Sequence, residues 1–111
     1  MNGDWGSYRY QKAVLKTCLK EVIRSGDYIV GHEQIMQAIE AGNVGMVVVA
    51  YHAEEPYKSQ ILLATLSKHT KVRVFRGTPQ ELGETCGMEH LNSIVVLDDV
   101  INDIISNLGG N

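Results

Sequence analysis

The chain has 111 residues, enough for one domain, and 44% of them are apolar, which argues against extensive disorder. The formal net charge of −3 excludes strong nonspecific attraction to nucleic acid, and no apolar run approaches the roughly 20 residues of a membrane span. The N-terminus lacks the pattern of a signal peptide. Cys18 and Cys86 are too few for a disulfide-stapled secreted domain, so we expect buried free thiols in a cytoplasmic protein.

The charge is unevenly distributed. Residues 1–25 carry five basic and two acidic side chains, for a balance of +3, whereas residues 26–111 carry five basic and eleven acidic side chains, for a balance of −6. A basic end on an acidic body can still form a local surface that faces phosphate groups.

Helical and strand patterns alternate along the chain, and only residues 1–6 and 109–111 look loose. The predicted elements are a helix at 7–24, a strand at 28–30, a helix at 32–41, a strand at 44–51, a helix at 56–68, a strand at 71–75, a short helix at 79–86, a strand at 93–97 and a final helix at 99–108. Thr78-Pro79-Gln80-Glu81 reads as a capping box with proline at the first helical position. Gly87 should end that helix in a left-handed conformation, and Gly83 should lie where the helix packs closely against a neighbour.

The alternation predicts a single domain over residues 1–111 with an α/β fold. We expect a three-layer α/β/α sandwich whose four-stranded sheet is mixed and largely parallel. Three of the helices begin just after strands, at Gly31-His32, near Pro56 and at Thr78-Pro79. Ligands gather at the carboxyl ends of strands in such sheets, and free N–H groups at helix N-termini attract anions. One edge of the domain is therefore suited to an RNA backbone.

Catalytic and metal-binding patterns are weak. No glycine-rich phosphate loop, CxxC or HExxH spacing occurs. His52 lies near Glu54 and Glu55, which is a poor metal signal for loop residues. Cys86 and His90 would straddle a helix end without a third group to orient them. We therefore expect no enzymatic activity, no metal, no cofactor and no small-molecule substrate.

A basic ridge is predicted on the first helix, where four cationic side chains recur at a spacing of four. These are Lys12, Lys16, Lys20 and Arg24. Two interpretations stay open: a solvated face opposite the apolar stripe, or a track that makes secondary contacts with nucleic-acid phosphates.

Several segments resemble one known family in order along the chain. Residues 24–31 are similar to its SGKYxLG opening, residues 66–72 to its LSKTKV segment, residues 75–87 to its FxG…ELGxxxG signature and residues 102–105 to its SDII ending. The chain thus resembles the kink-turn RNA-binding superfamily, and within it most closely the archaeal and eukaryotic large-subunit ribosomal proteins called thirty-e. The match covers about residues 8–108.

The resemblance implies a structural, non-catalytic constituent of the large ribosomal subunit, a cytoplasmic ribonucleoprotein component of translation. Its expected partners are rRNA, at a kink-turn-like site, and neighbouring ribosomal proteins. The RNA-facing positions carried over from the family are Gly31, His32, Glu33, Gln34 and Gln37 after the first strand, His52 after the second, Gly77, Thr78, Pro79 and Gln80 before the ELG helix, and His90 and Leu91 after it.

This sequence departs from the family at those positions. Glu33 stands where the family often has lysine or asparagine, and Gln37 where it has lysine. His52 replaces an asparagine or acidic residue, and His90 an aromatic or apolar one. Since Glu33 would repel phosphate, an alternative function is a protein-interaction module that no longer binds RNA.

Overall fold

The computed structural model describes residues 3–99, 101 and 104, and the side chains from residue 10 onward. In chain order its elements are α1 (Gly3–Ser25), β1 (Tyr28–Ile29), α2 (His32–Ala41), β2 (Met46–Ala50), α3 (Tyr57–Ser67), β3 (Val72–Phe75), α4 (Pro79–Thr85) and β4 (Ser93–Val96). All eight elements predicted up to residue 97 are present, although α1 begins before the predicted Ser7. The predicted final helix lies almost wholly outside the described residues.

The four strands form one mixed sheet in the order β1-β4-β2-β3. β2 and β3 are parallel, while β4 is antiparallel to both of its neighbours, β1 and β2. β1, β2 and β3 thus run in one direction, but the expectation of a largely parallel sheet is wrong for neighbouring pairs, since two of the three are antiparallel. The reason is the length of α4: its seven residues span only about 10 Å. The chain therefore returns to the sheet at the same end of the strands at which β3 finishes, and β4 runs in the opposite direction.

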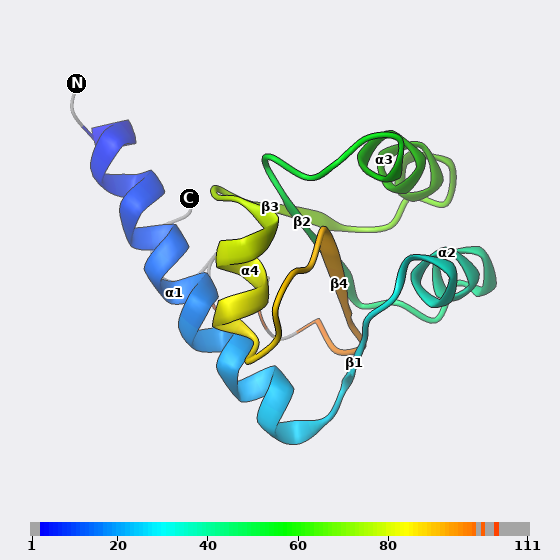
Figure 1. Cartoon of the computed structure of the whole chain (residues 1–111), viewed down its shortest axis with the longest axis horizontal. Helices are drawn as coiled ribbons and strands as arrows, with labels where there is room; N and C mark the ends of the chain where they lie inside the picture. The colour runs from blue at the N-terminus through cyan, green and yellow to red at the C-terminus, as the bar shows by residue number, and fades with distance from the viewer. Residues whose placement is uncertain (1–2, 100, 102–103, 105–111) are drawn as a thin grey trace.

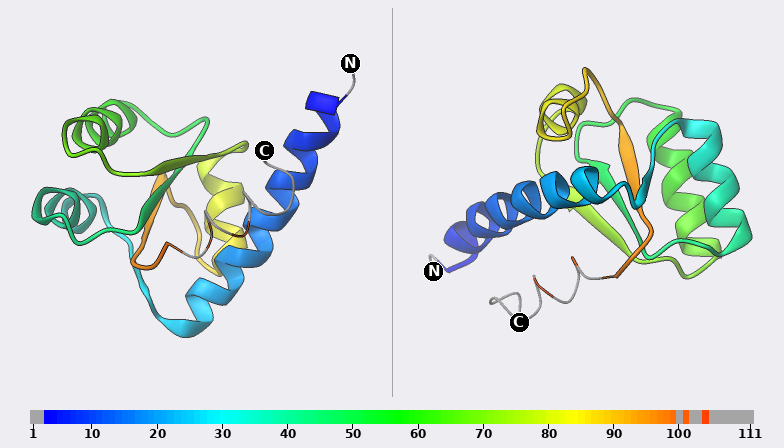
Figure 2. Two further views of the ribbon diagram at one scale, coloured as in Figure 1. Left: turned by 180° about the vertical axis from the view of Figure 1, so that it is seen from behind. Right: turned by 90° about the horizontal axis from the view of Figure 1, so that it is seen from below.

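Helices cover both faces of the sheet, as the views in Figures 1 and 2 agree: α1 and α4 lie on one side, and α2 and α3 on the other. The core accordingly has two parts. Met46 and Val48 of β2 pack with α1 and α4, whereas Val47 packs with Ile39 of α2 and Ile61 of α3. All five residues of β2 are buried. This confirms the three layers, and the nearly unbroken apolar run of β2 suits a strand that is covered on both faces.

α4 and the loop after it are shaped by a cap and two glycines. The Thr78 hydroxyl accepts a hydrogen bond from the Glu81 N–H at 3.1 Å, as the capping box predicts. Gly87 follows the helix with φ of +73°, which confirms its left-handed conformation. A Cβ on Gly83 would lie 2.5 Å from the backbone nitrogen of His90. The helix and the 89–90 backbone are therefore in direct contact, as predicted, and this contact fixes the loop that carries His90.

Candidate nucleic-acid interface

The strand directions bring four separate segments to one edge of the sheet. Because β4 runs against the other three strands, its amino end lies beside the carboxyl ends of β1, β2 and β3. We call this edge the rim; its segments are residues 31–37, 51–54, 77–80 and 90–92. The rim contains all twelve positions expected to face RNA. Their contact with RNA stays a prediction.

Hydrogen bonds join three of the four rim segments to one another. The His52 N–H donates to the Gly77 carbonyl at 3.2 Å, and the Leu91 N–H donates to the Pro79 carbonyl at 3.0 Å. Asn92 accepts two more bonds, from Ala50 N–H to its carbonyl at 2.9 Å and from Glu54 N–H to its side chain at 2.8 Å. The loops after β2, after β3 and before β4 therefore form one connected surface.

The corner between β1 and α2 is a sharp turn that only glycine adopts easily. Gly31 has φ of +95°, and its carbonyl accepts the Ile35 N–H at 2.9 Å. His32 is held against α3: its Nε2 lies 2.7 Å from Gln60 Oε1, and its ring meets that of Tyr57 edge-on at 4.9 Å. The three remaining predicted contact residues of this corner are exposed: Glu33, Gln34 and Gln37.

Two of the predicted contact residues direct their side chains into the protein. Leu91 is only 9% exposed and belongs to the core cluster under α1 and α4, and Pro79 is buried as well. Any contact with RNA from these two residues has to come from the backbone. Thr78, Gln80, His52 and His90, in contrast, are exposed. Gly77 is half-buried.

His90 lies across the rim from a carboxylate. Its Nε2 is 3.5 Å from Glu54 Oε2, and Asn92 Nδ2 donates to the other Glu54 oxygen at 3.5 Å. Glu54 is thus tied to the segment before β4. Besides Glu33, the rim presents this second carboxylate.

Three residues that sequence reasoning did not place in the site stand out on the rim or directly beside it. Tyr51 is 49% exposed, because β2 ends one residue before it. Lys58 Nζ lies 4.9 Å from the centre of the Tyr51 ring, and Arg76 Cζ lies 5.8 Å from it. Lys58 also donates to the Tyr51 carbonyl at 2.6 Å. The available signal in the sequence was an aromatic residue directly after a buried strand, with a lysine seven residues later and an arginine directly after the next strand.

The basic ridge of α1 is neither simply a solvated face nor an unobstructed track for phosphates, the two interpretations that the sequence left open. Lys12 and Lys16 both lie 3.0 Å from Glu81 Oε2 of α4, and both are half-buried. Partial burial raises the pKa of Glu81, but the hydrogen bonds from the two lysines outweigh it and hold the pKa below its usual value. Arg24 pairs with Glu21 at 3.4 Å. Lys12 and Lys16 therefore join α1 to α4, which leaves the ridge a smaller capacity for phosphate than the sequence suggested.

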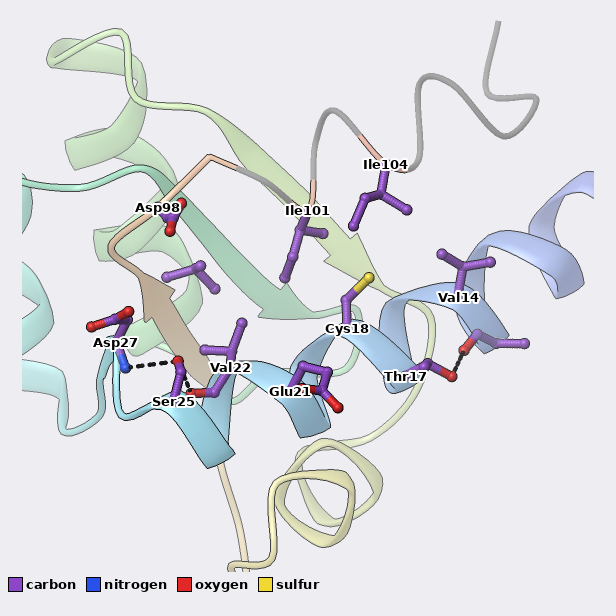
Figure 3. A pocket seen from close by; sticks show the side chains of 12 residues that line it. Val14, Thr17, Cys18, Glu21, Val22, Ser25, Asp27, Asp98, Ile101 and Ile104 are labelled. Atoms are coloured by element: carbon purple, nitrogen blue, oxygen red, sulfur yellow. Dashed lines mark hydrogen bonds between the residues drawn. The ribbon is translucent and has the colours of Figure 1, made fainter.

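A pocket lined largely by α1 lies away from the rim. It has a volume of about 650 Å³ between α1 and residues 101 and 104, and Figure 3 shows Cys18 directed toward Ile101 and Ile104. Its lining is mainly apolar. Because the pocket adjoins the predicted final helix, most of which lies outside the described residues, it is no evidence for a ligand-binding site.

The described residues give no support to the metal or nucleophile patterns. Within them, no three His, Cys, Asp or Glu side chains are grouped to hold a metal ion. Cys18 and Cys86 are buried free thiols, as predicted. Burial raises the pKa of Cys86 to about 11, so the thiol four residues before His90 stays protonated at neutral pH and is a poor nucleophile. No helix in the described part of the chain is long and apolar enough to cross a membrane.

The fold and rim define a class of small three-layer α/β proteins that present loops at one edge of a mixed sheet. The family model described as "Ribosomal protein L7Ae/L30e/S12e/Gadd45 family" matches residues 13–104, and the chain belongs to that family. The resemblance seen in the sequence is thereby confirmed.

Individual relatives agree with this assignment. The chain is similar to large ribosomal subunit protein eL30 of Spodoptera frugiperda, at 31% identity over 78% of each chain, and to that of Candida albicans, at 28% identity over 78% of this chain and 82% of the relative. The same protein of Methanopyrus kandleri is 28% identical over 79% of this chain and 82% of its own. A solved structure of a protein with unknown function from Bacillus halodurans C matches with a TM-score of 0.74 at 26% identity, over 84% of this chain and 93% of that one.

Proposed function

We propose that this protein is a structural, non-enzymatic constituent of the large ribosomal subunit in the cytoplasm, and that it binds rRNA through the rim at a kink-turn-like site. The observation that carries the proposal is the convergence of four loops on one edge in a chain similar to eL30 proteins over most of its length. Neighbouring ribosomal proteins are its other expected partners.

The rim has features that suit a sharply bent RNA backbone. Gly31 at the start of α2 has no side chain of its own, so that only the exposed Gln34 side chain, which lies over it, would have to turn aside for a phosphate. The N-terminus of that ten-residue helix lies at the rim, where its first N–H groups have no partner within the helix. Thr78, Gln80 and His52 supply exposed polar groups on the adjoining loops. Three of the four segments are already joined by hydrogen bonds, so RNA binding there requires little ordering of the protein.

The acidic groups on the rim weaken binding of isolated RNA. Glu33 is exposed in the first turn of α2, where it suits the helix dipole but faces an approaching phosphate. Glu54 adds a second negative charge beside His90. We expect weak binding of a free kink-turn RNA and stable association within the subunit, where several surfaces act together.

Sedimentation tests the proposal. Native lysate from the source cells is separated on a sucrose gradient at low salt, and the protein is followed with an antibody. It should co-sediment with ribosomes and, after chelation of magnesium separates the subunits, move with the large subunit. If the protein stays at the top of the gradient in both conditions, the ribosomal proposal is wrong.

A protein-interaction module without RNA binding is the second candidate. Two observations favour it: the balance of −6 over residues 26–111, and an apolar surface on α3 where Leu63 is 67% and Leu66 73% exposed. Neighbouring exposed apolar side chains that form one patch are a mark of a contact surface. A protein at the top of the gradient in a discrete complex larger than 12.3 kDa would favour this candidate.

A further inference from the structure

The four segments of the rim contain no lysine and no arginine. Their permanent charges are the two carboxylates Glu33 and Glu54, which give the segments a formal charge of −2. Four charged residues adjoin these segments, in sequence or by contact, and their formal charges cancel: Lys58, Arg76, Glu55 and Glu89. A surface of this composition repels the phosphates of RNA at neutral pH.

Histidines are the groups of the rim segments that can become positive. Three of the four histidines in the chain lie there: His32, His52 and His90. Histidine exchanges its proton between about pH 5 and 8, so these rings gain charge in mild acid. Uptake of three protons would change the formal charge of the segments from −2 to +1. The fourth histidine, His69, follows α3 and lies near the amino end of β3, opposite the rim.

His90 is the rim histidine whose ring the structure places against a carboxylate. Its Nε2 lies 3.5 Å from Glu54 Oε2, and both side chains are exposed. Asn92, which is uncharged, completes this cluster by donating to the other Glu54 oxygen. Protonation of His90 therefore turns a contact between a carboxylate and a neutral ring into an ion pair, and it cancels the charge of Glu54.

α4 packs against the segment that carries His90. Gly83 meets the backbone of residues 89–90 and brings no charge to it. Of the two carboxylates of α4, Glu81 is held by Lys12 and Lys16, and Glu84 is exposed.

The other two rim histidines face different groups. The His52 ring meets the Tyr51 ring edge-on at 4.9 Å, and Lys58 and Arg76 approach the same tyrosine. His32 is held by uncharged groups of α3, through its contact with Gln60. We therefore assign the main role to His90 and a smaller one to the other two rings.

We propose that protonation of His90 controls RNA binding by the rim, with Glu54 as the charge that it neutralises. At neutral pH the rim repels phosphate and holds RNA weakly. In mild acid the His90–Glu54 pair becomes neutral, and phosphates of the bound RNA favour the protonated ring. Binding then takes up a proton, so the affinity rises as the pH falls through the range in which histidine titrates. This inference rests on the proposed RNA binding by the rim.

The test titrates a labelled kink-turn RNA with the full-length protein at pH 7.5, 6.5 and 5.5 and constant low salt. Uptake of one proton changes the binding constant by up to tenfold for each pH unit. The parent should therefore bind about tenfold more tightly at pH 5.5 than at pH 7.5. This ratio should shrink at high salt, because the effect is electrostatic.

Three variants identify the group that titrates, and the ratio of the affinities at pH 5.5 and pH 7.5 is the readout. His90→Gln cannot take up a proton, and its ratio should fall below about threefold. His90→Lys carries a permanent charge, so at pH 7.5 it should bind about as tightly as the parent does at pH 5.5. The control His69→Asn removes a histidine outside the rim and suits the left-handed φ of +54° there, so it should keep the tenfold ratio.

The comparison between variants also controls for titration of the RNA itself. The same RNA is used throughout, so protonation of its bases affects every protein equally. Thermal melting at pH 5.5 and pH 7.5 checks that each variant is folded.

The outcomes separate this inference from the proposed function. A parent that binds the RNA at none of the three pH values would overturn both. Equal affinity of the parent at pH 7.5 and pH 5.5 would overturn the control by protonation and leave RNA binding by the rim standing. The same holds for a folded His90→Gln protein that keeps the tenfold ratio, or for His69→Asn losing it to the same extent as His90→Gln.

Discussion

The contact between Gly83 and the loop before β4 makes a quantitative prediction for Gly83→Ala. The new methyl group would lie 2.5 Å from His90 N, 2.7 Å from Glu89 C and 2.8 Å from His90 Cα, all of them backbone atoms that cannot rotate away. Relieving these contacts requires the loop to move by several tenths of an ångström. Overpacking of this kind costs about 3 kcal/mol, and the better helix propensity of alanine returns about 1 kcal/mol.

We therefore expect Gly83→Ala to lower the free energy of unfolding by about 2 kcal/mol, which corresponds to a fall in melting temperature of about 8–16 °C. Because the displaced loop carries His90, binding of RNA at the rim should weaken as well. Gly87→Ala should cost less, about 1 kcal/mol, since a Cβ there meets nothing within 4 Å and only the left-handed φ of +73° is strained.

Thermal melting followed by circular dichroism checks this order, with Glu84→Ala as a control on the exposed face of α4. Glu84→Ala should melt within about 2 °C of the parent. A Gly83→Ala protein that melts with the parent, or above Gly87→Ala, would show that the loop before β4 yields freely and that the packing argument is mistaken.

Two further predictions concern charges. Glu81→Gln should destabilise the fold by about 0.5–1 kcal/mol at pH 7 by removing the partner of Lys12 and Lys16, as measured by urea unfolding. Since the pKa of Glu81 is lowered in the folded state, its contribution to stability is fully present above the usual pKa of 4.5 and disappears as the pH falls through the folded value. A difference in unfolding free energy between parent and variant that persisted unchanged at pH 3 would contradict this. Glu33→Lys should raise the affinity of the protein for kink-turn RNA about tenfold at low salt and less at high salt, because it exchanges repulsion of phosphate for attraction. The control Glu40→Lys, at the far end of α2, should raise this affinity clearly less in the same titration.

Local rules predicted most of the fold. The apolar run of β2 and the Thr78 cap of α4 are short-range signals, and both elements formed where the sequence indicated. The direction of β4 was missed, because it depends on where a seven-residue helix delivers the chain and not on the pattern of the strand itself.

The site was predicted less completely, since its contacts join distant parts of the chain. Glu81 lies 69 residues from Lys12, so the loss of two lysines from the basic ridge could not be read from a spacing of four. Tyr51 was expected as the last residue of a buried strand, and its exposure follows only from the end of β2 at Ala50. The positions of the rim itself came from the resemblance to the family and from the rule that loops at the carboxyl ends of strands share an edge.

Direct titration of RNA with the full-length protein tests the central claim, that the rim recognises a sharply bent RNA. The labelled RNAs are a kink-turn and a straight control with the same two stems, in which the internal loop is fully base-paired. The account predicts that the protein prefers the kink-turn at least about tenfold, even though Glu33 and Glu54 keep the affinity itself modest. Equal affinity for the bent and straight RNAs, or no binding of either at low salt, would contradict the assignment of the rim as an RNA-binding site.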